Sequence, residues 1–249
     1  MFETLRKLIT EQLNISPGCS LCEYGRVKIP YADGRIGYKF EYCDCRKQYK
    51  QLKKLISLYK KANIPFAALS VYDPENYTES AVSLTALKLF SDGRAKAPWL
   101  YLSGKPGTGK TYTAMVALFF ALGSFKKVLY VNTPRLLDSL RPGIDQETGQ
   151  QLMKLCIECE FLVLDDIGQE KVSDWVRERL YIIINERYMA RRQTIFTSNL
   201  SMEDLKIKLD HPALISRIKH LSVPVTFSAE LDRRTPIYSL PENQCEQRL

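Results

Sequence analysis

A glycine-rich stretch at residues 104–111 carries the clearest chemistry in this sequence. It reads G-K-P-G-T-G-K-T and fits the pattern G-x-x-x-x-G-K-[ST]. In this pattern the glycines allow a tight turn in which several backbone N–H groups point at one phosphate. Lys110 adds a mobile positive charge for the outer phosphates, and the Thr111 hydroxyl is a ligand for Mg²⁺. The predicted nucleotide-binding residues are Gly104, Lys105, Pro106, Gly107, Thr108, Gly109, Lys110, Thr111 and Tyr112.

Two carboxylates follow the apolar run of residues 161–164. Such a run predicts a buried strand, and ligands of open α/β sheets bind at the carboxyl ends of the strands. Asp165 is placed to hold Mg²⁺, directly or through water, and Asp166 to orient and help deprotonate an attacking water. Two such residues alone are more often a loop start or a helix cap. Together with the stretch at 104–111, they favour a site that binds and hydrolyses ATP.

Two further polar residues follow in the order expected of such a site. Asn199 follows the predicted strand 194–198 and could hydrogen-bond the γ-phosphate or the attacking water, although asparagine is also a common turn residue. Arg217 lies late on a predicted helix, where an arginine often only satisfies the helix dipole. Its position after the other nucleotide-binding elements favours an arginine finger that reaches the ATP of a neighbouring subunit.

The elements that must position these residues alternate along the chain. From residue 97 onward, short apolar segments alternate with amphipathic helical segments, which predicts an α/β fold with a parallel sheet flanked by helices. The predicted strands are 99–103, 128–132, 161–165, 194–198 and 223–227. The predicted helices are 110–122, 134–141, 148–159, 173–191 and 211–219.

With these elements in this order, the chain resembles the DnaC/DnaI-type bacterial replicative helicase loaders, which are AAA+ ATPases of the initiator/loader clade. No guanine-specific Asn-Lys-x-Asp motif and no Leu-Ser-Gly-Gly motif occurs. The resemblance covers about residues 60–235, and the related transposition helper ATPases (IstB-like) share much of it. It runs through Leu164–Gly168, Trp175–Glu178, Thr197–Asn199, Ser216–Ile218 and Asp232–Arg234.

The resemblance implies roles for individual residues. Lys110 and Thr111 match the Walker A motif, and Asp165 and Asp166 match Walker B. Asn199 matches sensor 1 and Arg217 the arginine finger. The second-sensor arginine would be Arg233 or Arg234, although residues 228–249 are too few for the usual C-terminal helical lid. The implied fold is an AAA+ P-loop domain with a five-stranded parallel sheet and no lid.

Four cysteines near the N-terminus predict a zinc site. Cys19 and Cys22 are separated from Cys43 and Cys45 by two predicted strands, 26–31 and 35–42, around a turn. Folding this hairpin brings both pairs together, as in a zinc ribbon with four thiolates, although C-x-C replaces the usual second C-x-x-C. A further pair, Cys156 and Cys159, is interpreted as core or half-buried thiols. His211 and His220 are not expected to bind metal.

Charge and hydropathy give the remaining expectations. The formal net charge is +8, and residues 1–61 alone carry a net +7, which indicates an arm for nucleic acid or an acidic protein surface, or else a solvated helix face. The longest apolar run, 114–122, is too short to span a membrane, and no secretory signal is visible, so we expect a cytoplasmic protein.

The predicted organisation is an N-terminal zinc-binding, helicase-interacting domain at 1–61, a linker at 62–96 and an AAA+ ATPase domain at 97–249. By the resemblance, the chain binds a hexameric replicative DNA helicase of the DnaB type and delivers it to single-stranded DNA, with self-association through the ATP site. Two alternatives are a transposition helper that acts with a transposase on duplex target DNA, and an adaptor that binds ATP without hydrolysis. The N-terminal cysteines favour the loader over the first, and the paired acids argue against the second.

Overall fold

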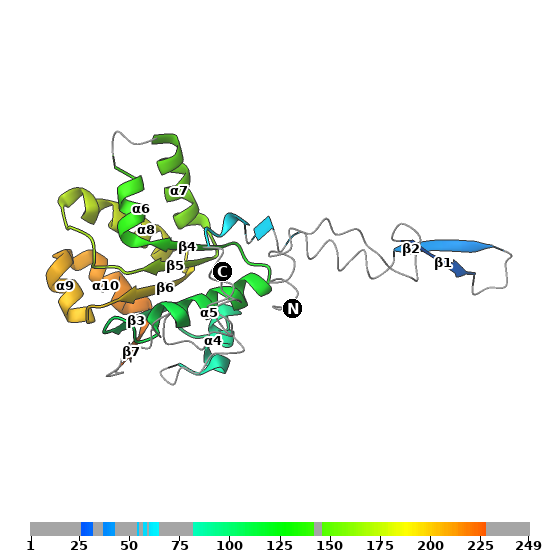
Figure 1. Ribbon diagram of the computed structural model, residues 1–249, viewed down its shortest axis with the longest axis horizontal. Coiled ribbons are helices and arrows are strands. Elements are labelled where there is room, and N and C mark those ends of the chain that lie inside the picture. Colours follow the sequence, from blue (N-terminus) through cyan, green and yellow to red (C-terminus); the bar gives the residue numbers. More distant parts are fainter. Residues whose placement is uncertain are drawn as a thin grey trace, which may run out of the picture.

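The computed structural model describes residues 26–31, 37–42, 54, 57–58, 60–64, 82–141 and 146–227. Most of these residues form layers around a five-stranded sheet with the strand order β4-β5-β6-β3-β7 (Figure 1). The strands are β3 (Trp99–Gly104), β4 (Val128–Asn132), β5 (Phe161–Asp165), β6 (Gln193–Ser198) and β7 (Ser222–Phe227). All four pairs of neighbouring strands run parallel. The predicted five-stranded parallel sheet is confirmed.

The central strands are apolar along their length because helices cover both faces of the sheet. All five residues of β5 are buried, as are the first five of β3. The helices are α4 (Leu84–Ser91), α5 (Lys110–Gly123), α6 (Thr133–Ser139), α7 (Gln146–Glu158), α8 (Asp174–Met189), α9 (Met202–Leu209) and α10 (Pro212–Leu221). None of the described helices is long and apolar enough to cross a membrane.

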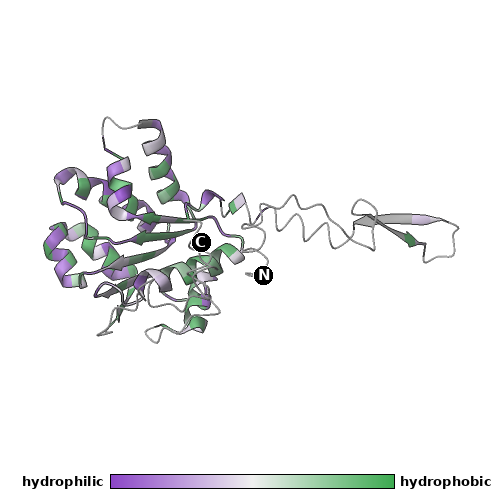
Figure 2. Cartoon of the chain, viewed as in Figure 1, coloured by the Kyte–Doolittle hydropathy of each residue, from purple (hydrophilic) through white to green (hydrophobic). Residues whose placement is uncertain are grey.

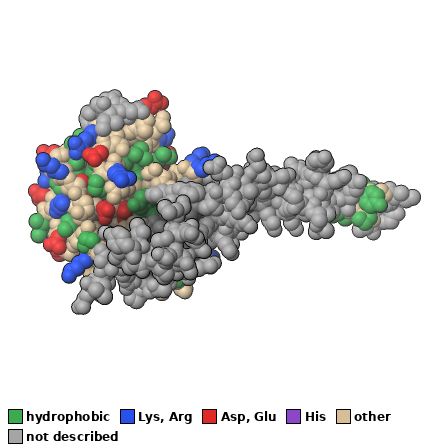
Figure 3. Space-filling model, in the orientation of Figure 1, with side chains coloured by type: hydrophobic (Ala, Val, Ile, Leu, Met, Phe, Trp, Pro, Cys, Tyr) green, Lys and Arg blue, Asp and Glu red, His purple; other side chains and the backbone are tan. Residues whose placement is uncertain are grey.

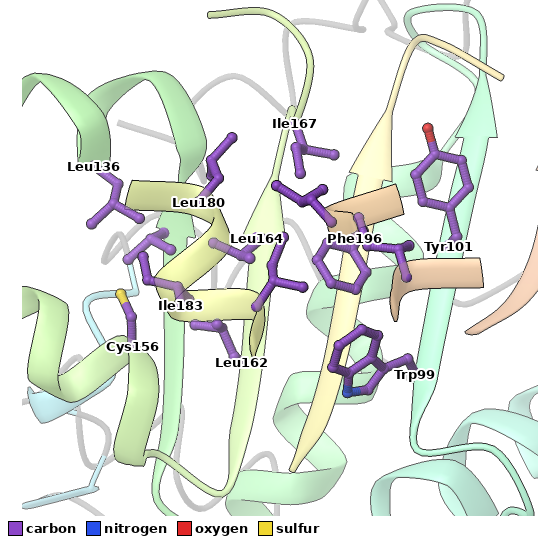
Figure 4. Close-up of a cluster of buried hydrophobic side chains, with 14 of the residues drawn as sticks. Trp99, Tyr101, Leu136, Cys156, Leu162, Leu164, Ile167, Leu180, Ile183 and Phe196 are labelled. Atoms are coloured by element: carbon purple, nitrogen blue, oxygen red, sulfur yellow. The ribbon is translucent and has the colours of Figure 1, made fainter. Parts of the chain in front are cut away.

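Alternate residues of the strands feed two separate apolar clusters. Leu100 and Leu102 of β3 pack with α4 and α5 on one face, and α5, which is mostly green in Figure 2, is buried on several sides. Trp99 and Tyr101 pack with α6 to α10 on the other face, where Figure 4 shows them beside Phe196. The sheet is thus held between two helical layers, which fixes its carboxyl edge in place.

Parts of the predicted linker belong to this core. Leu87 and Phe90 of α4, together with Ala62 and Ile64, are buried in the cluster on the α5 face. Neither α4 nor α9 was predicted as a helix. The other helices and the five strands of the sheet match the predicted ones, with ends that differ by at most two residues.

The two strands predicted between the cysteine pairs are also present. β1 (Arg26–Pro30) and β2 (Tyr38–Tyr42) form an antiparallel pair in which Arg26 lies opposite Tyr42 and Pro30 opposite Tyr38. The hairpin prediction is confirmed for these strands. The four cysteines lie outside the described residues, as do residues 228–249 with Arg233 and Arg234.

Candidate nucleotide-binding site

The glycine-rich stretch forms the predicted loop between a strand and a helix. β3 ends at Gly104, and α5 begins at Lys110. Gly104 has φ +148°, and a Cβ there would lie 2.5 Å from the Phe227 carbonyl oxygen at the end of β7. Gly109, with φ +97°, is the N-cap of α5 and has no side chain to cap the first N–H groups. The loop thus leaves this helix start open to a phosphate, which the helix dipole also favours.

Lys110 lies inside its own loop rather than in solvent. The side chain is 5% exposed, and its ammonium donates hydrogen bonds to the carbonyl oxygens of Gly104 at 2.8 Å and Lys105 at 2.7 Å. The Thr108 hydroxyl donates to the same Lys105 carbonyl at 2.8 Å. These bonds hold a positive charge at the loop, where the outer phosphates of a nucleotide would bind.

Asp165 joins this loop to three strands. One carboxylate oxygen accepts hydrogen bonds from the hydroxyls of Thr111 at 2.9 Å and Thr197 at 2.6 Å. The other accepts from the Tyr130 hydroxyl at 2.8 Å. The Thr111 hydroxyl and the Asp165 carboxylate are hard oxygen ligands close to each other, so this pair fits Mg²⁺.

Asp166 lies beside Asp165 but in a different environment. It is half-buried, with φ +59°, a left-handed conformation that is uncommon for a residue other than glycine. Its backbone N–H donates to the Thr197 hydroxyl at 2.9 Å, and its carboxylate accepts from the Asn132 amide at 3.2 Å. The Asn132 amide therefore orients the Asp166 carboxylate at the edge of the sheet where the strands end.

Three residues of this network were missed by the sequence reasoning: Tyr130, Asn132 and Thr197. Asn132 pairs with Asp165 across β4 and β5, and Thr197 lies on β6, the other neighbour of β5. Polar residues near the ends of strands 128–132 and 194–198 were a signal for them, but their contact with the acids depends on strand order.

The loop that follows Asp166 is held to the end of β6. Ile167 exchanges two hydrogen bonds with this strand, donating its N–H to the Thr197 carbonyl at 2.9 Å and accepting from the Ser198 hydroxyl at 2.6 Å. Glu170 turns its buried carboxylate back onto the Gly168 N–H at 3.0 Å, and burial raises the pKa of this carboxyl. Asn199, half-buried, comes directly after β6 at the same edge. The structure thus gathers the loop, both acids and Asn199 along one edge.

Comparison with known families agrees with this geometry. Residues 77–234 match the family described as IstB-like ATP binding protein. The chain belongs to this family. The match spans the P-loop, both acids, Asn199 and Arg217, so ATP binding follows at the level of the family.

Individual relatives add detail to this membership. The IstB-like chain is 25% identical to the replicative helicase loader DnaI of Bacillus subtilis, over 95% of this chain and 85% of the relative. It is 32% identical to an insertion-sequence ATP-binding protein of Pseudomonas fluorescens, over 59% of this chain and 64% of the relative. A crystal structure of the DnaC helicase loader superposes with a TM-score of 0.56 at 25% identity, covering 64% of this chain and 97% of the other. The predicted resemblance to DnaC/DnaI-type loaders is confirmed, as is an AAA+ core.

Arg217 lies in a different part of this IstB-like chain, on α10, and its side chain contacts α8. It donates to the Asn185 side-chain oxygen at 2.9 Å and to the Ala213 carbonyl at 2.9 Å. Its guanidinium also lies over the rings of Tyr181, at 5.0 Å, and Tyr188, at 5.6 Å. In this conformation the side chain bonds within its own subunit, and it remains half-buried at the surface.

The remaining candidate residues have structural partners. Cys156 and Cys159 are buried free thiols, as predicted, and burial raises the pKa of Cys156 to about 12. The His211 side chain accepts from the Leu214 N–H at 3.2 Å and caps α10. The other histidine, His220, hydrogen-bonds the Tyr188 hydroxyl.

Proposed function

We propose that this chain is an ATP-dependent helicase loader that binds a hexameric replicative DNA helicase and delivers it to single-stranded DNA. The observation that carries the proposal is the similarity to DnaI, which extends over 95% of the chain and so beyond the ATPase core into the N-terminal part. The insertion-sequence relative matches only 59% of the chain.

The ATP site supplies the chemistry for this cycle. The phosphates of ATP bind to the loop of residues 104–109 and the start of α5, and the Lys110 ammonium moves from its loop carbonyls to the outer phosphates. Thr111 and Asp165 would hold Mg²⁺, which supplies charge neutralisation at the phosphates. Asp166, oriented by Asn132, accepts a proton from the attacking water, and Asn199 donates to that water or to the γ-phosphate.

Arg217 acts on the ATP of the next subunit in this proposal. Its hydrogen bonds to Asn185 and Ala213 and its stacking on two tyrosines are contacts of the separate chain. Being half-buried, the side chain can exchange them for a γ-phosphate when subunits assemble. ATP turnover therefore depends on self-association.

The two ends of the chain complete the proposal. Residues 1–61 form a zinc-binding unit, with Zn²⁺ held by Cys19, Cys22, Cys43 and Cys45, that contacts the helicase. Residues 62–96 connect it to the ATPase domain of residues 97–249, and α4, Ala62 and Ile64 of this segment pack into the core of that domain. Arg233 or Arg234 contacts the nucleotide as a second sensor.

A second candidate function is that of a transposition helper ATPase. It is supported by the family match and by the 32% identity to the insertion-sequence protein. An adaptor without hydrolysis is disfavoured, because Asp166 has both its backbone and its side chain held in place beside the Mg²⁺ ligands.

Co-purification tests the proposal. The full-length chain is mixed with ATP and either the replicative helicase or an IstB-associated transposase from the same genome, and complexes are separated by size-exclusion chromatography. A loader forms a complex with the helicase, and the wild type but not Lys110→Ala increases helicase bound to single-stranded DNA. A complex with the transposase alone would establish the second candidate and exclude the first.

A further inference from the structure

A groove of about 390 Å³ lies beside β4, away from the P-loop. β4 is an edge strand of the sheet, and its last residue, Asn132, lines the groove. One wall comes from residues 60–64 and the other from α6, with Leu152 of α7 contributing an apolar contact. No residue of the loop 104–111 lines it. The groove is thus a second concave site at the carboxyl end of a parallel strand, which is where ligands of α/β sheets bind.

The polar lining of the groove is positively charged. Lys60 and Arg135 contribute one cation from each wall, and none of the described residues that line the groove is an aspartate or glutamate. Within the part of the chain that the structure describes, neither cation has a carboxylate within salt-bridge distance. On the face of the molecule seen in Figure 3, basic and acidic side chains are mixed over the described surface.

The wall at residues 60–64 is fixed to the edge of the sheet. The Tyr130 N–H donates to the Ala62 carbonyl at 2.9 Å, and the Asn63 amide donates to the Tyr130 carbonyl at 3.1 Å. Ala62 is fully buried, and Ile64 is nearly so. These contacts hold Lys60 close to β4 although the two segments lie far apart in sequence.

The opposite wall is fixed by its own hydrogen bonds. The Asn132 side-chain oxygen accepts from the Arg135 N–H at 3.4 Å, and the Ser139 hydroxyl donates to the Arg135 carbonyl at 2.9 Å. Leu136, also in the lining, is 2% exposed and anchors α6 in the core. The backbone that carries the Arg135 guanidinium is therefore set before any ligand binds.

We propose that this groove is a second phosphate site, which binds the phosphate of a nucleotide unit between Lys60 and Arg135. The amide of Asn63 has a second N–H that can donate to a phosphate oxygen, and the Ser139 hydroxyl oxygen, in the same lining, can accept from a sugar hydroxyl. Ile64 and Leu152 give the groove an apolar side for a base. The nucleotide unit belongs either to a single strand of nucleic acid or to a free mononucleotide, which share this chemistry.

The groove is connected to the ATP site through Tyr130. This residue lines the groove, holds the wall at Ala62 and Asn63 with its backbone, and donates its hydroxyl to Asp165. The inference rests on the proposed function only in that a loader encounters single-stranded DNA. The phosphate chemistry of the groove depends on neither ATP hydrolysis nor the helicase.

Charge reversal with matched controls tests the site. The P-loop of the full-length chain is first saturated with a non-hydrolysable ATP analogue. Binding of a labelled oligothymidylate is then measured by anisotropy, and binding of dTMP and of inorganic phosphate by calorimetry. Lys60→Glu is compared with Lys61→Glu, its exposed neighbour outside the groove, and Arg135→Glu with Arg141→Glu, also exposed and outside the lining.

Each groove variant is expected to bind at least one probe roughly tenfold more weakly, as for the loss of one charge-assisted contact, while the controls stay within about twofold of the wild type. If the groove variants bind oligothymidylate more weakly, and dTMP does not compete with oligothymidylate on the wild type, the ligand is a phosphate of a nucleic-acid strand. Loss of dTMP or phosphate binding identifies a free ligand. Equal binding of every probe by groove and control variants, or no binding by the wild type, would overturn the inference. Equal oligothymidylate binding would still leave the loader proposal standing.

Discussion

Two arginines differ in their surroundings: Arg187 belongs to α8, and Arg217 of α10 packs against the same helix. Arg187 is fully buried and donates to the carbonyl oxygens of Cys156 at 2.8 Å, Cys159 at 2.9 Å and Gln193 at 2.5 Å. Arg217 is half-buried and lies between two tyrosine rings, with a side-chain amide as one of its acceptors.

The difference shows which cation the fold needs and which it can release. The carbonyls around Arg187 belong to the end of α7, the turn before β5 and the start of β6, and burial leaves them no water to replace the guanidinium. Burial also lowers the pKa of Arg187, with no carboxylate among its hydrogen-bond partners. The partners of Arg217 can turn to solvent when it leaves. Arg187 is therefore structural, and Arg217 is able to act elsewhere.

Replacing Arg187 is expected to have the largest effect on the stability of the fold. Arg187→Ala removes the guanidinium donor from the carbonyls of Cys156, Cys159 and Gln193, which costs about 4 kcal/mol of the free energy of unfolding. Urea unfolding followed by the fluorescence of buried Trp99 measures this loss. Arg191→Ala, an exposed arginine just beyond the same helix, should change it by less than about 0.5 kcal/mol. Similar unfolding free energies for Arg187→Ala and Arg191→Ala would show that Arg187 is not needed for the fold, and it would then no longer differ from Arg217 in this respect.

Arg217→Ala should lose activity rather than stability. As a finger, Arg217 accelerates turnover in the assembled state by about 10³-fold, while its loss costs only about 1 kcal/mol of unfolding free energy. The sharpest measurement mixes Arg217→Ala with Lys110→Ala, each inactive alone. At an interface between them, the intact arginine of the Lys110→Ala chain faces the intact ATP site of the other chain.

Partial recovery of hydrolysis on mixing establishes action between subunits. The control is a wild-type sample shown to assemble at the same concentration. If that control assembles and the mixture stays inactive, Arg217 is a structural arginine of the α8–α10 contact. The two arginines would then both stabilise the fold and differ only in how much.

Glu170 gives the smallest expected effect. Burial raises the pKa of its carboxyl above the ordinary 4.5, so the native state binds the proton more tightly than the unfolded chain does. The stability from this protonation is complete below about pH 4.5 and is lost as pH rises through the raised native pKa. The unfolding free energy of the wild type, relative to Glu170→Gln, should therefore fall as pH rises from about 4.5. A difference between the wild type and Glu170→Gln that does not change with pH would contradict the burial of this carboxyl.

Much of the fold could be predicted because its signals are local. Runs of four apolar residues marked the strands at 99–102, 128–131 and 161–164, shorter apolar runs marked the other two, and the glycines of 104–109 marked the turn into α5. The short helix α9 was missed, because Ile207 at its exposed face breaks the apolar periodicity even though Ser201 caps it. α4 was missed within a segment interpreted as a linker.

The loop and the two acids of the site could be predicted from the sequence, but the residues that hydrogen-bond these acids could not. Thr197 contacts Asp165 because β6 is the neighbour of β5, and strand order cannot be read from segments of similar composition. Arg187 was missed because an arginine in a helix usually indicates a solvent-facing position. Its acceptors come from three elements that lie apart in sequence, so their contact with Arg187 also depends on the tertiary fold.

The central claim is that Lys110 holds the phosphates of ATP and that Asp166 acts on the attacking water. Measuring ATP affinity and turnover of Lys110→Ala and Asp166→Asn, side by side with the wild type, tests it most directly. Lys110→Ala is expected to lose ATP binding. Asp166→Asn should keep its affinity within about threefold and lose turnover by about 10²- to 10⁴-fold, because its carboxylate acts in the transition state and not on bound ATP. Equal loss of affinity in both variants, or wild-type turnover in Asp166→Asn, would contradict it.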